Sequence, residues 1–172
     1  MSPVYGILIA VLVERIVELG ISARNSRWLI ERGATELGAG HYPLFFLLHG
    51  SWFVAIIYTV SPDRAVNWWL IAAFAMLQLG RLWILVTLGK YWNTRIYILR
   101  DQPLVTTGPY RWFRHPNYLI VTLEIPLLPL AFGAWKIAIA WSIANAALLW
   151  HRIRIEETAL APRRASFAGT EK

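Results

Sequence analysis

The sequence contains no cysteine. This absence excludes disulfide bonds, zinc sites built from thiolates and catalysis by a thiol nucleophile. The chain also has no Gly-x-Gly-x-x-Gly motif after a strand-like segment, so it lacks the signature of a Rossmann cofactor site. We expect no metal ion at the functional site.

Charged residues are scarce. They make up 16% of the 172 residues, whereas a soluble domain of this size usually carries about 25%. Hydrophobic residues account for 57% of the chain, and its mean hydropathy is +0.45. This composition predicts a membrane protein that has no room for a separate soluble domain.

Acidic residues are the scarcer charge, with 10 Asp and Glu against 17 Lys and Arg and a net charge of +7. Such an excess could indicate binding to nucleic acid. The basic residues, however, flank apolar segments and do not form one soluble face, which favours anionic lipid headgroups. We therefore expect membrane lipids and no nucleic acid as partners, and the oligomeric state stays open.

Long apolar segments predict about five membrane-spanning helices. The first three cover about Pro3–Leu19, Tyr42–Val60 and Trp68–Leu88. The last apolar stretch, Leu119–Trp150, would be about 48 Å long as one helix, whereas a hydrocarbon core is about 30 Å thick. We predict a helical hairpin there, broken by Pro126, Pro129 and Gly133. A single, strongly kinked helix is the alternative.

The positions of Lys and Arg orient these spans. Most of them lie in the loops Ile21–Gly40 and Gly89–Pro116 and in the C-terminal tail, whereas the opposite side has only Arg64 and Lys136. The positive-inside rule places both loops and the C-terminus in the cytoplasm, with the N-terminus outside. The first segment lacks a basic n-region and a small-residue cleavage site, so we expect a retained helix and not a signal peptide.

Charged residues interrupt the predicted spans at Glu14, Arg15, Glu18, Arg81 and Glu124. A charge at membrane depth costs about 2.5–3.5 kcal/mol on insertion scales and usually faces a partner or a cavity. Because Glu14 and Glu18 lie one turn apart, an arginine such as Arg81 could be their counter-ion between helices. Two interpretations stay open: salt bridges that fix the bundle, or the polar floor of a cavity open to the cytoplasm.

A polar, aromatic segment at Gly108–Tyr118 lies between two apolar stretches. Irregular backbone at membrane depth must be buried or line a cavity, so this segment predicts a site. Pro116 suits the first turn of a helix, where we expect the free N–H groups of Asn117 and Tyr118 to bind a carboxylate or phosphate. Arg114 and His115 add hydrogen-bond donors, and Tyr110 and Trp112 add flat aromatic faces for a ring or a cation. The alternative is a basic aromatic belt on anionic lipid.

A second polar cluster follows the predicted hairpin, at Trp150–Glu157. Arg152 and Glu156 are four residues apart and therefore lie on one helical face, as an ordinary surface ion pair would. The hairpin would return this face to the Arg114–Tyr118 segment. We therefore expect the two clusters to form one pocket at one membrane surface.

These motifs, in order, resemble those of the isoprenylcysteine carboxyl methyltransferase family. The resemblance covers about Gly89–Leu160 and rests on three elements: Leu104–Tyr110 (LVTTGPY), Arg114–Tyr118 (RHPNY), and Arg152 followed by Glu156-Glu157. It implies an integral membrane enzyme that uses S-adenosyl-L-methionine without a Rossmann domain and releases S-adenosyl-L-homocysteine.

The resemblance also assigns roles to individual residues. The cofactor pocket is expected to be lined by Gln102, Pro103, Leu104, Val105, Tyr110, His115, Pro116, Asn117, Tyr118 and Glu156. Arg95 lies where a further cofactor contact is expected. Arg152 would orient the acceptor oxygen as the catalytic and substrate-binding residue, and Arg114 would also contact the substrate. His115 is not assigned as a base. For His41 and His49 we expect packing roles, with substrate contact as the alternative.

The expected architecture is a single all-α domain, residues 1–172. It would comprise three spans in 1–88, a cytoplasmic cofactor loop in 89–116, the hairpin and a cofactor-binding helix end in 117–160, and a frayed tail in 161–172. The cofactor site would lie at the cytoplasmic face of a bacterial inner membrane.

The N-terminal half resembles a small bacterial branch of the family, some members of which O-methylate alkylpyrones or alkylresorcinols. This favours a lipophilic small molecule over a prenylated protein, with a carboxyl, enol or phenol oxygen as acceptor. Gln102 and Leu119 depart from the family pattern and leave the substrate open. The alternatives are a phospholipid N-methyltransferase and a non-catalytic membrane protein that binds anionic lipid.

Overall fold

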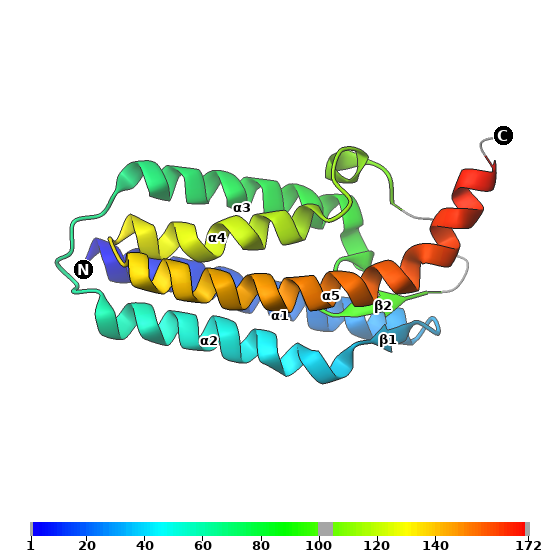
Figure 1. The fold of residues 1–172 in the computed structure, drawn as a ribbon, viewed down its shortest axis with the longest axis horizontal. Helices are drawn as coiled ribbons and strands as arrows, with labels where there is room; N and C mark the ends of the chain where they lie inside the picture. The colour runs from blue at the N-terminus through cyan, green and yellow to red at the C-terminus, as the bar shows by residue number, and fades with distance from the viewer. Residues whose placement is uncertain (1, 100–104, 171–172) are drawn as a thin grey trace.

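The computed structural model describes residues 2–99 and 105–170, with side chains as far as Ala161. Within these residues, long helices run side by side along the longest axis of the molecule (Figure 1). They are α1 (Pro3–Ile30), α2 (Tyr42–Thr59), α3 (Trp68–Leu88), α4 (Pro116–Ala131) and α5 (Trp135–Thr170). The N-terminus and the α2–α3 and α4–α5 connections lie at one end of the bundle, and the C-terminus lies at the other (Figure 1).

The predicted hairpin is confirmed, but its turn lies at Phe132–Ala134. Gly133 has a φ of 74° there, and the N–H groups of Gly133 and Ala134 donate to the carbonyls of Leu130 and Pro129 at 2.9 and 2.8 Å. This is the Schellman arrangement, in which a left-handed glycine ends a helix. Gly133 is therefore the breaker.

Pro126 and Pro129 lie inside α4, so their predicted role as breakers was wrong. A proline inside a helix leaves the carbonyl four residues earlier without its donor, which for Pro129 is the carbonyl of Ile125. The indole Nε1–H of Trp52 on α2 donates to this carbonyl at 3.1 Å. A neighbouring helix thus satisfies the group that Pro129 leaves free, and α4 continues.

The first helix is longer than predicted. α1 continues through residues expected to form a cytoplasmic loop and ends at Ile30. The buried side chain of Asn25 explains part of this, because its Nδ2 donates to the carbonyls of Gly89 at 3.1 Å and Trp92 at 2.8 Å. The end of α1 therefore holds the short 3₁₀ helix η2 (Gly89–Tyr91).

A small sheet, which the all-α prediction did not include, joins two loops at the C-terminal end of the bundle. Strand β1 (Thr35–Leu37) pairs antiparallel with β2 (Ile96–Ile98), with Glu36 opposite Tyr97. Two further 3₁₀ helices, η1 (Ala39–His41) and η3 (Gly108–Arg111), lie in the connecting segments. Residues 161–170, expected to be a frayed tail, continue α5.

Among the residues that the structure describes, two helical stretches are long and apolar enough to span a membrane, namely Ala39–Thr59 and Trp68–Tyr91, and α4 is a shorter apolar helix. Large apolar side chains are also exposed on the other helices, such as Ile16 on α1 (59% exposed) and Ile143 on α5 (68% exposed). The predicted count of about five spans stays a prediction.

The main buried core lies toward the N-terminal end of the bundle. It joins Val4 and Leu8 on α1 to Trp52 and Ile56 on α2 and Leu128 on α4. A smaller cluster of Ile84, Trp92 and Ile120 lies toward the other end. Fewer apolar side chains fill that end, and the pockets described below open there.

Candidate functional site: two pockets that share a wall

A polar pocket of about 140 Å³ lies between β2, η3, the start of α4 and α5. Its walls are formed by side chains of 14 residues, most of them polar or aromatic. These residues are Leu88, Tyr91, Trp92, Asn93, Arg95, Ile96, Tyr97, Tyr110, Arg114, His115, Asn117, Tyr118, Arg152 and Glu156.

Most of the residues expected at the site meet in this polar pocket: Arg95, Tyr110, Arg114, His115, Asn117, Tyr118, Arg152 and Glu156. The two polar clusters that the sequence places at Gly108–Tyr118 and Trp150–Glu157 are therefore brought together. Val105 and Pro116 are not part of the lining. Gln102, Pro103 and Leu104 lie outside the described residues.

Tyr118 connects the two clusters through hydrogen bonds. The Nε–H of Arg152 donates to the Tyr118 hydroxyl oxygen at 2.9 Å, and that hydroxyl donates to a carboxylate oxygen of Glu156. Arg152 also donates from Nη2 to the backbone carbonyl of Thr94 at 2.6 Å. Its Nη1 forms no hydrogen bond to any described residue. Arg152 is thus held rigidly and keeps one donor available.

His115 supports the same wall from the other side. Its ring stacks on that of Tyr118, with ring centroids 5.3 Å apart and planes inclined by 17°. Its Nε2–H donates to a carboxylate oxygen of Glu157 at 2.5 Å, and Nδ1 lies 3.9 Å from Glu156. Glu157 was part of the recognised motif but was not predicted as a site residue. The hydrogen bond between the two side chains indicates that Glu157 orients the imidazole ring of His115.

The beginning of α4 differs from the expectation in one respect. Pro116 is the first helical residue and is buried, as predicted. The N–H of Tyr118, however, is not free, because it donates to the carbonyl of His115 at 3.1 Å. Within the described part of the chain, the N–H of Asn117 has no such partner. One free backbone donor therefore remains at this helix end.

Arg95 reaches the pocket because the small sheet holds its side chain. Its Nη1 donates to Glu36 at 2.7 Å, and its guanidinium lies 4.2 Å from the ring centre of Tyr42. The hydrogen bond to Glu36 raises the pKa of Arg95, which keeps it charged. Tyr110 stays a neutral phenol, since burial and then the charge of Glu156 raise its pKa.

A second, mostly apolar cavity of about 280 Å³ lies deeper in the bundle. Its lining comes from every long helix and from the segment after η2. The lining residues are Leu12, Arg15, Glu18, Leu19, Tyr42, Phe45, Phe46, His49, Gly50, Phe53, Arg81, Trp92, Thr94, Asn117, Tyr118, Val121, Leu149 and Arg152. Trp92, Asn117, Tyr118 and Arg152 also line the polar pocket, so these four form the wall between the two spaces.

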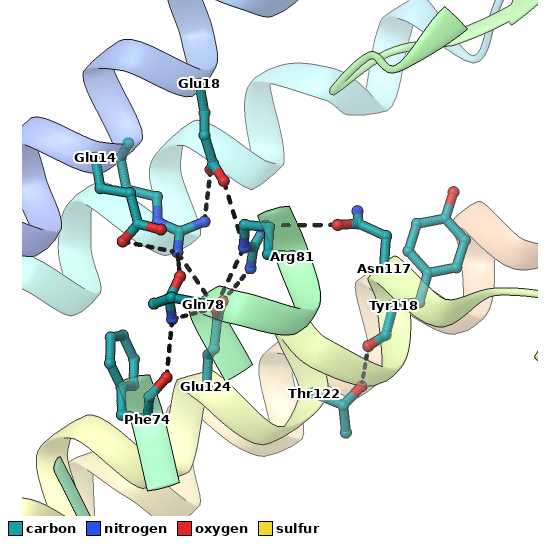
Figure 2. A network of polar contacts seen from close by, with 10 residues as sticks. Glu14, Glu18, Phe74, Gln78, Arg81, Asn117, Tyr118, Thr122 and Glu124 are labelled. Carbon is teal, nitrogen blue, oxygen red and sulfur yellow. Dashed lines mark hydrogen bonds and ion pairs between the residues drawn. The ribbon is translucent and has the colours of Figure 1, made fainter. Parts of the chain in front are cut away.

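The charges inside the bundle form one network (Figure 2), and three of its members, Arg15, Glu18 and Arg81, line the apolar cavity. Arg15 contacts Glu18 at 2.7 Å and Glu124 at 3.3 Å, while Arg81 contacts Glu18 at 3.4 Å and forms a close pair with Glu124. Gln78 donates to Glu124 at 2.7 Å. The predicted pairing of Arg81 with an acidic residue of α1 is confirmed for Glu18, whereas Glu14 contacts Arg15. The first interpretation is confirmed, because salt bridges join the helices. Arg15, Glu18 and Arg81 also line a cavity, whose opening to the cytoplasm stays a prediction.

Three contributors to the site had no signal in the sequence. The Thr94 carbonyl that binds Arg152 is a backbone atom, and every residue has one. Glu36 and Tyr42 reach the site through the sheet pairing and the face of α2, which depend on tertiary structure. Within the described residues, no group of His, Asp and Glu side chains could hold a metal ion.

Comparison with known proteins yields one family and two relatives. The model of the isoprenylcysteine carboxyl methyltransferase (ICMT) family matches residues 69–162. The uncharacterized protein YpbQ of Bacillus subtilis is 40% identical over 161 residues, covering 91% of this chain and 96% of YpbQ. An uncharacterized protein of Haemophilus influenzae is 29% identical over 160 residues, covering 88% of this chain and 91% of that protein. No solved structure matches.

Proposed function

Because the chain belongs to the isoprenylcysteine carboxyl methyltransferase family, we propose that it transfers a methyl group from S-adenosyl-L-methionine to an oxygen of a lipophilic acceptor. Membership of the family and two apolar helices indicate a membrane methyltransferase. Members of this family use S-adenosyl-L-methionine. The acceptor and the use of the cofactor by this chain are the proposal.

The polar pocket has the chemistry that the cofactor requires. The Glu156 carboxylate suits the ammonium group or the ribose hydroxyls, and the stacked rings of His115 and Tyr118 offer a flat face to adenine or the sulfonium. Arg114 and the free N–H of Asn117 suit the methionine carboxylate. The residues present therefore fit this cofactor.

The shared wall carries the proposal. Tyr118 and Arg152 each face a polar pocket on one side and an apolar cavity on the other. A methyltransferase needs the methyl donor and the methyl acceptor to meet at one place, and their alignment there lowers the activation barrier of the transfer. The side chains of this wall therefore lie where a lipid head in the apolar cavity would meet the cofactor.

Arg152 favours an oxygen acceptor over an amine. Its Nη1 keeps a free donor at the wall, which can hold a carboxylate or an enolate or phenolate oxygen, whereas its positive charge repels an ammonium group. Bound S-adenosyl-L-methionine would supply the methyl group: the oxygen held by Arg152 would gain the O–CH₃ bond as the S–CH₃ bond breaks with its electron pair left on sulfur, which would give the methylated lipid and S-adenosyl-L-homocysteine. A phenol or enol first loses its proton to water, and a carboxylate has none to lose.

The proposed setting is the inner membrane of a bacterium, with the N-terminus outside and both pockets toward the cytoplasm. Two observations support it. The basic loops lie at the end of the bundle that holds the pockets. The two relatives are bacterial proteins. Large apolar side chains are exposed on α1 and α5, which supports the proposal that these helices also cross the membrane.

Calorimetric titration of the purified protein in detergent tests cofactor binding. We expect saturable binding of S-adenosyl-L-methionine, weakened about tenfold or more by Glu156→Gln, because a hydrogen bond to a charged group contributes about 1.5–3 kcal/mol. Glu31→Gln is the matched control, since that side chain is 72% exposed near the end of α1. Absence of saturable binding by the unsubstituted protein would contradict the proposal and favour a non-catalytic lipid-binding protein.

A further inference from the structure

One face of α2 lines the apolar cavity, and a single imidazole interrupts it. His49 lies three or four residues from Phe45, Phe46 and Phe53, and Tyr42 is one further turn along the same face. Gly50, beside His49, contributes no side chain and leaves room in the cavity. A polar ring in an aromatic lining needs a partner, because a buried polar group without one is costly.

A hydrogen bond fixes the tautomer of His49. Its Nδ1 lies 2.8 Å from the backbone carbonyl of Phe45. A carbonyl oxygen can only accept, so Nδ1 carries the proton and Nε2 of the neutral ring carries the lone pair. Among the described residues, Nε2 has no hydrogen-bond partner. His49 therefore brings a free acceptor to the cavity.

Among the described residues that line the cavity, no polar group donates a hydrogen bond to Nε2 of His49. On the floor, Arg15 and Arg81 are both bound to Glu18 and Glu124 (Figure 2). At the wall, Arg152 uses two of its groups for Tyr118 and Thr94 and keeps Nη1 free. Among the described residues, the cavity thus offers a donor without a partner at Arg152 Nη1 and an acceptor without a partner at His49 Nε2.

Phe45 on α2 lies beside both groups. The guanidinium of Arg152 lies 5.2 Å from the ring centre of Phe45. His49 is one helical turn beyond Phe45, which is about 5.4 Å along the axis of α2. The ring centre of His49 lies 6.5 Å from that of Phe45, so Arg152 and His49 both lie beside Phe45, and a molecule with one oxygen at Arg152 can present a second polar group to His49.

We propose that His49 Nε2 accepts a hydrogen bond from a second hydroxyl group of the methyl acceptor. This inference rests on the proposed function and narrows its substrate class. The acceptor would be an alkyl-chain amphiphile whose head carries two oxygens, one methylated beside Arg152 and one hydroxyl donating to His49. A lipid with a single carboxylate would leave His49 without a partner.

Two matched acceptors test the proposal: a resorcinol with one long alkyl chain, and a phenol with the same chain but no second hydroxyl. We expect kcat/KM to be about two- to tenfold higher for the resorcinol, after correction for its two equivalent hydroxyls, because a neutral hydrogen bond contributes about 0.5–1.5 kcal/mol. His49→Leu should remove this preference, so that the two acceptors have the same kcat/KM after that correction. His49→Gln keeps a carbonyl acceptor and should restore part of the preference.

Phe53→Leu is the control within the cavity, since it removes apolar contact and should lower both rates by the same factor. Binding of S-adenosyl-L-methionine, measured on every variant, reports folding and the cofactor site. Equal loss on both acceptors in His49→Leu contradicts the inference, as does methylation of neither phenol by an unsubstituted protein that binds the cofactor. If the unsubstituted protein does not bind the cofactor at all, the proposed function itself fails.

Discussion

The account depends most on two side chains, Arg152 and Tyr118. Arg152 is 7% exposed and is held by the Tyr118 hydroxyl and the Thr94 carbonyl. The Tyr118 hydroxyl in turn donates to Glu156, so a residue at the proposed acceptor side is linked to one at the proposed cofactor side. The position of Arg152 therefore depends on the same hydroxyl that positions Glu156.

Tyr118→Phe tests this link, because it removes the hydroxyl and keeps the ring stacked on His115. We expect kcat to fall about tenfold to a hundredfold, because hydrogen bonds to charged groups contribute about 1.5–3 kcal/mol. Steady-state methyl transfer measures the change. Tyr58→Phe is the matched control, since Tyr58 is 87% exposed on α2. An unchanged kcat in Tyr118→Phe would show that the hydroxyl does not position Arg152.

At the residue scale, the sequence predicts which side chains meet at the site better than it predicts which backbone N–H groups are free. The motif residues from Tyr110 to Tyr118 meet Arg152 and Glu156 because the hairpin returns α5 to the start of α4. The free N–H expected at Tyr118 does not exist, because the first turn of α4 tightens and that group bonds to His115. Local backbone geometry of this kind depends on one or two dihedral angles and has no sequence pattern.

At the scale of elements, the charge network joins α1, α3 and α4 (Figure 2). Arg15 and Glu18 come from α1, Arg81 from α3 and Glu124 from α4. Arg81 and Glu124 are both nearly inaccessible, with side chains 5% and 7% exposed. The network therefore determines how these helices are placed around the cavity.

Arg81→Met should destabilise the protein strongly, since it leaves Glu18 and Glu124 without this counter-ion. Removing one partner of a buried ion pair typically costs about 3–5 kcal/mol. Denaturant unfolding in detergent measures the loss. The control is Arg24→Met, which changes an exposed arginine of α1.

The double variant Arg81→Met with Glu124→Leu checks the physical reason. Removing both partners leaves fewer unpaired charges, so this protein should be more stable than Arg81→Met alone. If the double variant is as unstable as the single one, or if Arg81→Met costs no more than Arg24→Met, the network does not determine the placement of the helices.

Apolar runs predict the helices well where length alone decides, as in Trp68–Leu88, which matches α3. They predict the ends of a helix wrongly where tertiary contacts lengthen the helix or satisfy a backbone carbonyl that a proline leaves free. The end of α1 is polar and is held by Asn25 against η2, and Trp52 keeps α4 intact around Pro129. The strands β1 and β2 have three residues each, which is too short for a periodic pattern.

At the scale of the whole molecule, the two pockets and the sheet lie at the end of the bundle opposite the main core. The wall of Trp92, Asn117, Tyr118 and Arg152 separates a polar space from an apolar one. The exposed apolar side chains of the helices suit a lipid surface. In the proposed function, a lipid head and a polar cofactor approach this wall from opposite sides.

The most direct test of the central claim is transfer of a labelled methyl group from S-adenosyl-L-methionine by the purified protein. The acceptors are the alkylated resorcinol, farnesylcysteine and phosphatidylethanolamine, and Arg152→Ala is compared with Arg24→Ala. The account predicts label on an oxygen of the resorcinol or farnesylcysteine, loss of that transfer in Arg152→Ala, and normal transfer in Arg24→Ala. Label on the amine of phosphatidylethanolamine, or no transfer by a protein that binds the cofactor, would contradict it.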